Sequence, residues 1–354
     1  MRRPWLSLAV AMTALLITAA PTLACGGLIG PNGAVNLLRT TTFAGYTDGV
    51  EHYVTSFEFA GGGGSFGSIT PLPGVPTDVV RGGDWTLQRL IRETDPVDEF
   101  AFRAASADSA AAGEAEVLLE TTIDALDITI LRGGGDEVGL WARNNGFRLP
   151  PDAPEVLDFY ADRSPIFMAA AFDADAAAAR GQALGDGTPV HLTIPTDNPW
   201  VPLRILGLGK ADGELVEADV YLLTDIEPAL LPKAGALAES DGLILDHSAE
   251  ATESLLADLR SDVGMEWVPD EAWLTKVVVN SEAGELDFDL AIDASGAGMP
   301  SPIDAGYAPF RDNAAPQSPV ALYLLLAAAL AISVPVLLSR TSGGNRRVPP
   351  LAGA

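Results

Sequence analysis

The sequence predicts an α+β fold with a mainly antiparallel sheet and a few helices, followed by one C-terminal transmembrane helix. Stretches rich in Thr, Val, Tyr and Phe flank turn residues, as they do in β-hairpins. These hairpins mix with helical stretches without a steady strand–helix alternation, which favours α+β over a parallel α/β sheet. Near the C-terminus, Val320–Leu338 carries no charge. A helix of that length, at about 1.5 Å per residue, roughly spans a hydrocarbon core of about 30 Å.

The N-terminus has the layout of a secretory signal peptide. Arg2 and Arg3 precede an apolar run from Trp5 to Ala20, and small residues follow. A cut after Ala24 defines residues 1–24 as the signal peptide and makes Cys25, the only cysteine of the chain, the first mature residue. The same site fits the end of a bacterial lipoprotein box except at one position, so acylation of Cys25 stands as the alternative to an unmodified thiol.

The exterior segment, residues 25–295, begins with a predicted hairpin. Its strands are Val35–Phe43 and Glu51–Phe59, joined by the turn residues "GYTDG". Side chains alternate between the two faces of a strand. One face of the second strand therefore presents Tyr53, Thr55, Phe57 and Phe59, and the other presents His52, Val54, Ser56 and Glu58.

Helices and further strands follow the hairpin. The stretch "GGDWTLQRLIRE" predicts a helix with Asp84 as its N-cap and Leu87, Leu90 and Ile91 on its buried face. A second helix is expected over Ser248–Ser261, with its leucines spaced for burial. The stretches "WLTKVVVN" and "ELDFDLAID" are expected to pair as a late hairpin around "SEAGE". The remaining expected strands are Val117–Thr121, Leu126–Leu131, Ile166–Phe172, Val190–Ile194 and Val216–Leu223. The length allows one domain or two packed subdomains.

The C-terminal part predicts a membrane anchor. Residues 296–318 are rich in Gly, Pro, Ser and Ala and form a stalk, residues 319–339 form the transmembrane helix, and residues 340–354 form a basic tail. Positive residues stay on the cytoplasmic side of a membrane. We therefore expect a single-pass protein of the cell membrane, with the N-terminal domain outside and the short tail in the cytoplasm. The alternative is a buried core helix.

Negative charge is concentrated in the exterior segment. The formal net charge of the chain is −27, from 48 Asp+Glu and 21 Lys+Arg. Five of the arginines lie in the targeting and anchor segments and no acidic residue does, so removing those five charges leaves −32 for the rest. Such a surface repels nucleic acid and suits a cation or a basic partner. No nucleic-acid partner is expected.

Several long stretches resemble one bacterial family. They are "CGGLIGPNGAVNLLRTTTFAGYTDGVEHYVTSFEFAG", "FGSITPLPGVP", "RGGDWTLQRL", "PEVLDFYADRSPIFMAAAFD", "NPWVPLRIL" and "DEAWLTKVVV". Together they are similar to the family catalogued as domain of unknown function 2330, over roughly Cys25 to Asp293. The resemblance implies a secreted or membrane-anchored envelope protein and implies no activity, so it assigns no catalytic residue.

The residues that carry chemistry elsewhere do not form a recognisable motif here. His52, His191 and His247 lie far apart, and a zinc site would need the fold to gather them. "GGSFG" places Ser65 in a Gly-x-Ser-x-Gly string, but an extended run follows it instead of the helix that a nucleophile elbow requires. No catalytic residue, metal site or cofactor is assigned, and an enzyme is the less favoured interpretation.

Carboxylates form the first weak candidate site. On the expected late strand, Glu285, Asp287 and Asp289 fall on one face at a period of two residues. Three like charges on one face destabilise a strand unless they are solvated or neutralised. The main interpretation is a solvated face. The alternative is a calcium site, because Ca²⁺ prefers oxygen ligands.

Trp200 is the second weak candidate. Pro195, Pro199 and Pro202 stiffen the chain around it and hold the indole in a fixed pose. If the indole is exposed, it suits a partner surface. A packed corner between strands is the more common arrangement and the main interpretation.

Two functions of different classes remain open. The first is a non-enzymatic binding or structural module of the cell envelope, with an unknown envelope protein or a wall polymer as partner. The second is a hydrolase-like envelope enzyme whose site is assembled from distant residues. Two histidines and a carboxylate around one cleft favour the enzyme, whereas histidines scattered over the surface favour the module.

Overall fold

A computed structural model describes residues 22–23, 27–30, 33–34, 39–57, 66–95, 116–181, 188–235, 242–294, 300, 302–303 and 305–306. The chain divides into two compact units, residues 1–307 and 308–354, and all described residues belong to the first. Among the described residues, no helix is long and apolar enough to cross a membrane. The expected transmembrane segment, the tail, most of the stalk, Cys25 and Ser65 lie outside the described residues.

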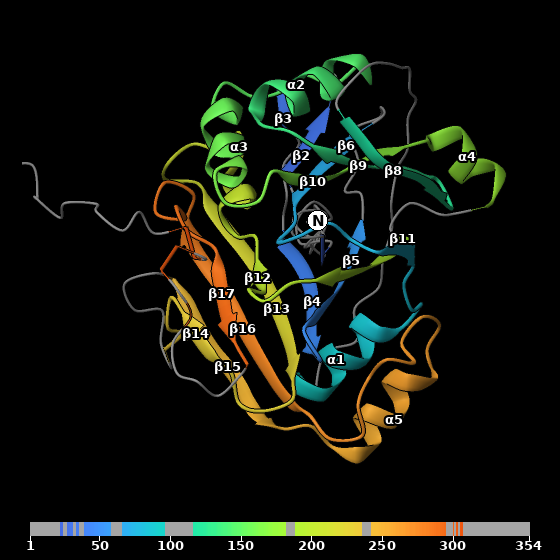
Figure 1. Cartoon of the computed structure of the whole chain (residues 1–354), viewed down its shortest axis with the longest axis vertical. Helices are drawn as coiled ribbons and strands as arrows, with labels where there is room; N and C mark the ends of the chain where they lie inside the picture. Colours follow the sequence, from blue (N-terminus) through green and yellow to red (C-terminus); the bar gives the residue numbers. More distant parts are fainter. Residues whose placement is uncertain are drawn as a thin grey trace, which may run out of the picture. The chain divides into compact units, whose positions relative to one another are not determined.

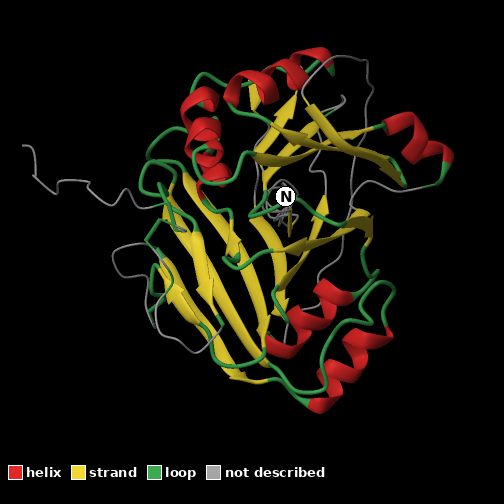
Figure 2. Ribbon diagram, viewed as in Figure 1, coloured by secondary structure: helices red, strands yellow, loops and turns green. Residues whose placement is uncertain are grey.

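The elements mix strands and helices as an α+β fold does (Figures 1 and 2). The strands are β1 (Thr22–Leu23), β2 (Gly27–Gly30), β3 (Gly33–Ala34), β4 (Arg39–Thr47), β5 (Val50–Phe57), β6 (Gly67–Pro71), β7 (Asp78–Arg81), β8 (Glu116–Ile123), β9 (Leu126–Arg132), β10 (Ile166–Phe172), β11 (Thr188–Pro195), β12 (Trp200–Val201), β13 (Leu215–Thr224), β14 (Ala229–Leu231), β15 (Leu243–Glu250), β16 (Trp273–Glu282) and β17 (Leu290–Asp293). The helices are α1 (Thr86–Thr94), α2 (Gly135–Asn144), α3 (Ala153–Ala161), α4 (Ala174–Ala179), α5 (Glu253–Ser261) and the 3₁₀ turn η1 (Arg204–Gly207).

The largest sheet has eight strands in the order β15-β16-β13-β4-β5-β11-β7, with β1 also paired to β4. The β4–β13 and β1–β4 pairs are parallel, and the other pairs of this sheet are antiparallel. A six-stranded sheet, β3-β2-β6-β10-β9-β8, and a three-stranded sheet, β12-β17-β14, complete the described strands. The prediction of an α+β fold with a mainly antiparallel sheet is therefore confirmed.

The first predicted hairpin is present and tighter than expected. β4 and β5 pair antiparallel, and their turn is formed by Asp48 and Gly49 alone, with φ of 51° and 76°. Positive φ at both central residues is typical of a type I′ turn, for which Asp-Gly is a preferred pair. Thr22 and Leu23, in the predicted signal peptide, pair with the start of β4, so a cut after Ala24 would remove this short strand.

Both faces of the eight-stranded sheet are buried, each against a different layer. Tyr53 of β5 belongs to a first core that also contains residues of the six-stranded sheet, α2 and α3. Val54, the next residue, belongs to a second core that contains Leu90 of α1 and Leu255 of α5. Figure 1 shows α1 and α5 side by side, away from α2 and α3. The period-two alternation along one strand thus supplies two cores at once.

Three local predictions are wrong. The second helix begins at Glu253 with Thr252 as its cap, because Ser248 is already part of β15. β16 pairs with β13 and β15 rather than with β17, so the late hairpin does not form. Asp84 is not the N-cap of α1, which begins after Trp85 without a side-chain cap of its own.

Candidate functional site: a buried histidine pair

The fold brings two of the three histidines into contact. In the antiparallel register of β5 and β11, His52 lies opposite Thr193 and His191 lies opposite Val54, so the histidines are diagonal neighbours on one face of the sheet. Nδ1 of His52 and Nε2 of His191 are 3.0 Å apart and share a hydrogen bond. His52 is 8% exposed and His191 is 4% exposed. His247 lies on the edge strand β15, four strands away from β5 in the sheet order, and does not join them.

An indole covers the pair. The rings of Trp267 and His52 are parallel within 1°, with centroids 3.9 Å apart, and the His191 ring centroid lies 6.1 Å from the indole. Gly45, the cross-strand neighbour of His52 on β4, leaves room for the indole. A Cβ at this glycine would lie 2.0 Å from Cη2 of Trp267, far inside van der Waals contact. The glycine is therefore a steric requirement of the stacked arrangement.

The chain that carries Trp267 is fixed by Asp262. We call residues 262–268 the cover loop. The buried carboxylate of Asp262 accepts hydrogen bonds from the main-chain N–H groups of Asp84 and Trp85, at 3.1 and 3.0 Å, and from the Thr86 hydroxyl at 2.8 Å. It thus caps α1 from a distant part of the sequence. Asp84, which the sequence suggested for this role, is exposed and pairs with Arg81 at 2.5 Å.

Burial decides the charge state of the pair. Desolvation lowers the pKa of His52, and the neighbouring imidazole lowers it further. Desolvation likewise lowers the pKa of His191, against the opposing effect of Asp78, Glu266 and the Gly264 main chain. At neutral pH both rings are therefore uncharged, and one can donate the hydrogen bond that the other accepts.

A second buried titratable group lies on the opposite face of β5. Glu51 is 0% exposed, and no hydrogen bond of good geometry reaches either carboxyl oxygen among the described residues. Burial raises the pKa of this carboxyl to about 8, and the nearby Trp200 main chain offsets the effect only partly. Glu51 is therefore protonated at neutral pH. Because side chains alternate, it faces the first core while His52 faces the second.

The carboxylates suggested for calcium do not share a strand face. Glu285 is exposed in a turn after β16, Asp287 is half-buried, and Asp289 is fully buried just before β17. Asp289 accepts hydrogen bonds from the Tyr160 hydroxyl at 2.8 Å and from two main-chain N–H groups. It also pairs with the guanidinium of Arg163. The shared strand face is therefore wrong, both as the solvated face of the main interpretation and as the geometry for a calcium site, because β17 begins after Asp289 and Asp289 is buried.

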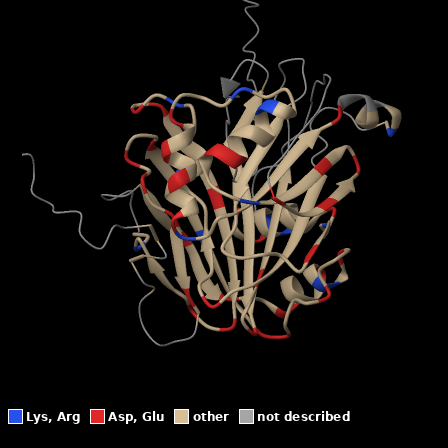
Figure 3. Ribbon diagram, turned by 45° about the horizontal axis from the view of Figure 1, so that its top comes forward, with Lys and Arg blue, Asp and Glu red and all other residues tan. Residues whose placement is uncertain are grey.

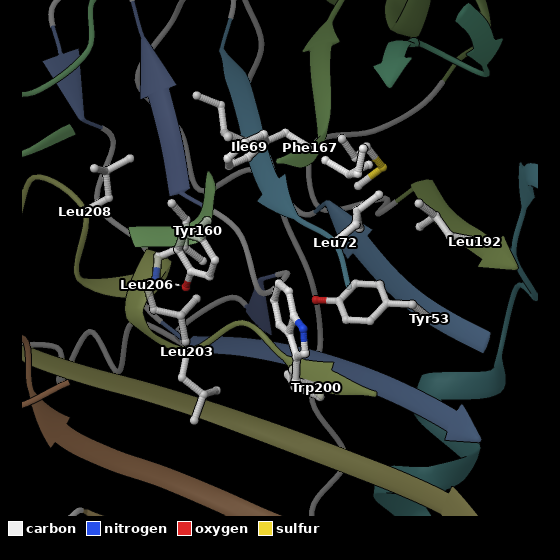
Figure 4. Packing of buried hydrophobic residues seen from close by; sticks show 14 of the residues in the cluster. Tyr53, Ile69, Leu72, Tyr160, Phe167, Leu192, Trp200, Leu203, Leu206 and Leu208 are labelled. Carbon is white, nitrogen blue, oxygen red and sulfur yellow. Dashed lines mark hydrogen bonds between the residues drawn. The ribbon is translucent and has the colours of Figure 1, made fainter. Parts of the chain in front are cut away.

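Trp200 is a core residue rather than an exposed one. It is 3% exposed in β12, and its ring stacks on Tyr160 with centroids 5.8 Å apart. The guanidinium carbon of Arg163 lies 4.8 Å from its ring centroid. Figure 4 shows Trp200 among Tyr53, Tyr160 and Leu203 in the first core. The exposure that a partner-binding indole requires is not found, and the main interpretation, a packed corner between strands, is what the structure shows.

The histidine pair offers two nitrogen ligands, and no group of three or more His, Cys, Asp or Glu side chains in the described ranges could hold a metal ion. Chemically, the pair is a proton acceptor kept neutral by burial. The sequence placed His52 and Val54 on one face, which is confirmed, but it contained no signal that β11 lies beside β5. Glu51 was missed because an isolated acidic residue in a strand ordinarily faces solvent.

The chain belongs to a bacterial family without an assigned activity. The model of the family described as "uncharacterized protein conserved in bacteria", domain of unknown function 2330, matches residues 19–283. No curated protein matches the sequence.

Solved structures give only a loose likeness. A crystal structure of a mutated baculovirus P35 after caspase cleavage is similar with a TM-score of 0.41 and 8% identity, over 73% of this chain and 98% of that one. A caspase-8/P35 complex gives a TM-score of 0.34 and 7% identity, over 72% of this chain and 90% of that one. Likeness at these TM-scores carries no argument about function.

Proposed function

We propose that the chain is a non-enzymatic binding module of the bacterial cell envelope that recruits a basic partner protein. In this proposal residues 1–24 are a cleaved signal peptide, residues 319–339 anchor the protein in the membrane, and the domain lies outside. The topology is supported by the sequence pattern at the two ends, and the envelope role by the resemblance to the family of domain of unknown function 2330. The nature of the partner is supported by the charges of the domain.

The proposal depends on the excess of acidic side chains and on the pairing of the basic side chains within the domain. Acidic residues outnumber basic ones by 48 to 21 in the chain, and Figure 3 shows acidic positions on most elements of the described part and basic positions on few. Most of the described basic side chains are already engaged within the domain. Those in ion pairs are Arg81, Arg89, Arg132, Arg163, Arg180, Arg204, Lys210, Arg260 and Lys276.

Internal pairing leaves a surface of mainly negative potential. Asp136, Asp158 and Asp162, for example, are exposed on or beside α2 and α3. A surface of this sign attracts cationic partners at long range and repels anionic wall polymers and lipid headgroups. Among the partners left open by the sequence, a protein with a basic face is therefore favoured.

The test is the salt dependence of partner capture. Full-length chain, tagged at its C-terminus and solubilised from native membranes, is used to isolate bound proteins at about 0.05 M and about 1 M NaCl. The Debye length falls to about 3 Å at 1 M, so an electrostatic partner should be lost. Isolation of a protein with a basic exterior domain only at low salt supports the proposal. Partners that are acidic, or retained equally at both salt concentrations, contradict it.

The envelope enzyme stays as a second candidate because the fold does bring His52 and His191 together. A neutral imidazole pair can act as a general base if a substrate reaches it. Assay of the purified full-length chain on chromogenic ester substrates, with His191→Gln as the matched inactive form, distinguishes the two candidates. Hydrolysis that is lost in His191→Gln would favour the enzyme.

A further inference from the structure

The cover loop lies where the histidine pair, α1 and the second core meet. Its indole stacks on His52, its Gly264 lies beside His191, and its Asp262 caps α1. Met265 and Val268 of the same loop are buried in the second core. The loop therefore connects the histidine pair to the cap of α1 and to the second core.

The contact between the rings depends on protonation. A neutral imidazole has one donor nitrogen and one acceptor nitrogen, whereas an imidazolium has two donors and no acceptor. With the two nitrogens 3.0 Å apart, the hydrogen bond survives only while at least one ring is neutral. Two imidazolium rings at that distance would place two donors against each other in a site shielded from water, which is unfavourable.

We propose that His52, His191 and Trp267 form an acid-sensitive latch, in which protonation of the pair separates the rings and releases the cover loop and the α1 cap from the sheet. This inference rests on the geometry of the closed loop and does not depend on the partner proposed above. A latch of this kind would let acidification open the second core without unfolding the six-stranded sheet.

The charges around the pair come from few elements. Asp78 of β7 and Glu266 of the cover loop favour protonation of His191. Asp262 is already engaged by α1, and Arg81 of β7 pairs with Asp84 and Asp124. The neighbours on β4 facing the pair, Phe43 and Gly45, are uncharged. None of these groups is an unpaired cation that would oppose protonation of the histidines. Burial is therefore the main cause of their lowered pKa values.

The direction of the pH effect follows from burial. The pKa values of both histidines are lowered in the closed state, so the open state binds more protons below the ordinary imidazole pKa of 6.5. Opening is therefore favoured as pH falls below about 6.5, by about tenfold per pH unit for one proton and up to about 100-fold for two.

Amide hydrogen exchange of the full-length chain in detergent measures this opening directly. Between pH 7 and pH 5, after correction for intrinsic exchange rates, protection of residues 83–94 and 262–268 should fall at least tenfold. Protection of β10 in the six-stranded sheet should hold, which separates local opening from unfolding. In His191→Gln the amide can still donate to His52 but cannot be protonated. Protection should therefore fall by at most about tenfold per pH unit in this variant, and more steeply in the unaltered chain, where both rings take up a proton.

His247→Gln is the matched control, because it removes the remaining histidine and lies outside the latch. It should behave as the unaltered chain does. If His191→Gln does not fold, the unaltered chain still tests the latch, because its local and global protection are measured together. Acid-induced opening that is equal in His191→Gln and the unaltered chain, or an unaltered chain whose cover loop keeps its protection at pH 5, would overturn the inference.

Discussion

Replacing Glu51 by Gln should make the protein more stable at high pH. The carboxyl is fully buried on β5, and burial raises its pKa from 4.5 to about 8. Because the folded-state pKa lies above the unfolded one, the folded state binds more protons between these values. The contribution of Glu51 to stability is therefore fully present below pH 4.5 and is lost as pH rises towards 8. The Gln side chain is nearly isosteric and does not ionise.

The size of the effect follows from linkage. Each pH unit inside the window changes the free energy of unfolding by about 1.4 kcal/mol, so the interval from pH 5 to pH 8 amounts to at most about 4 kcal/mol. Urea unfolding of Glu51→Gln and of the unaltered chain, both in the same detergent, gives the difference at each pH. This difference should grow steadily in favour of Glu51→Gln as pH rises.

The matched control is Glu285→Gln, an exposed carboxylate in the turn after β16 that should change the pH profile little. Profiles of Glu51→Gln and the unaltered chain that run parallel from pH 5 to pH 8 would refute the reasoning. They would show that water or a rearranged partner keeps the Glu51 carboxylate charged.

Three further substitutions, the last with a matched control, test the packing around the two cores. Gly45→Ala forces a Cβ against Trp267, 2.0 Å from the indole, and should destabilise the fold by about 1–3 kcal/mol and alter indole fluorescence. Asp289→Asn removes a fully buried carboxylate charge from the guanidinium of Arg163, whose side chain is 10% exposed, and should cost about 3–5 kcal/mol in urea unfolding. Asp262→Ala removes the cap of α1 and should cost about 2 kcal/mol, whereas Asp84→Ala should cost little because that carboxylate is exposed.

Each of these expectations has a contrary result. An unchanged melting temperature for Gly45→Ala would mean that the indole does not rest on the sheet. Equal losses of stability in Asp262→Ala and Asp84→Ala would show that Asp84, and not only Asp262, caps α1. Asp289→Asn with the stability of Asp287→Asn, a half-buried neighbour, would show that the guanidinium finds other partners.

The sequence predicted local structure well where one pattern dominates. The β4–β5 hairpin and β8, β9, β10, β11 and β13 lie where alternation and turn residues placed them. The sequence-based predictions were wrong where a contact between distant residues determines the local structure. β16 pairs with β13 and β15 rather than with the nearby β17, because all ten of its residues pair with β13 and it lies between β13 and the edge strand β15. The cap of α1 is Asp262, which lies 178 residues away from Asp84, the residue that the sequence predicted.

The histidine pair could not be predicted from the sequence for the same reason. Its histidines are 139 residues apart, and their contact depends on the β5–β11 register, which neither strand encodes alone. The prediction for Glu285, Asp287 and Asp289 was wrong for a different reason. A period-two pattern places carboxylates on one face only if the segment is a strand, and β17 begins at Leu290, after Asp289.

Membrane topology tests the central claim most directly. A reporter active only in the cytoplasm is fused after Ala354, and protease is added to intact cells. We expect an active reporter and removal of the domain ahead of Ser318, with the fused tail protected. An inactive reporter, or a domain that survives protease on intact cells and is digested only after lysis, would contradict a module held at the outer face of the membrane.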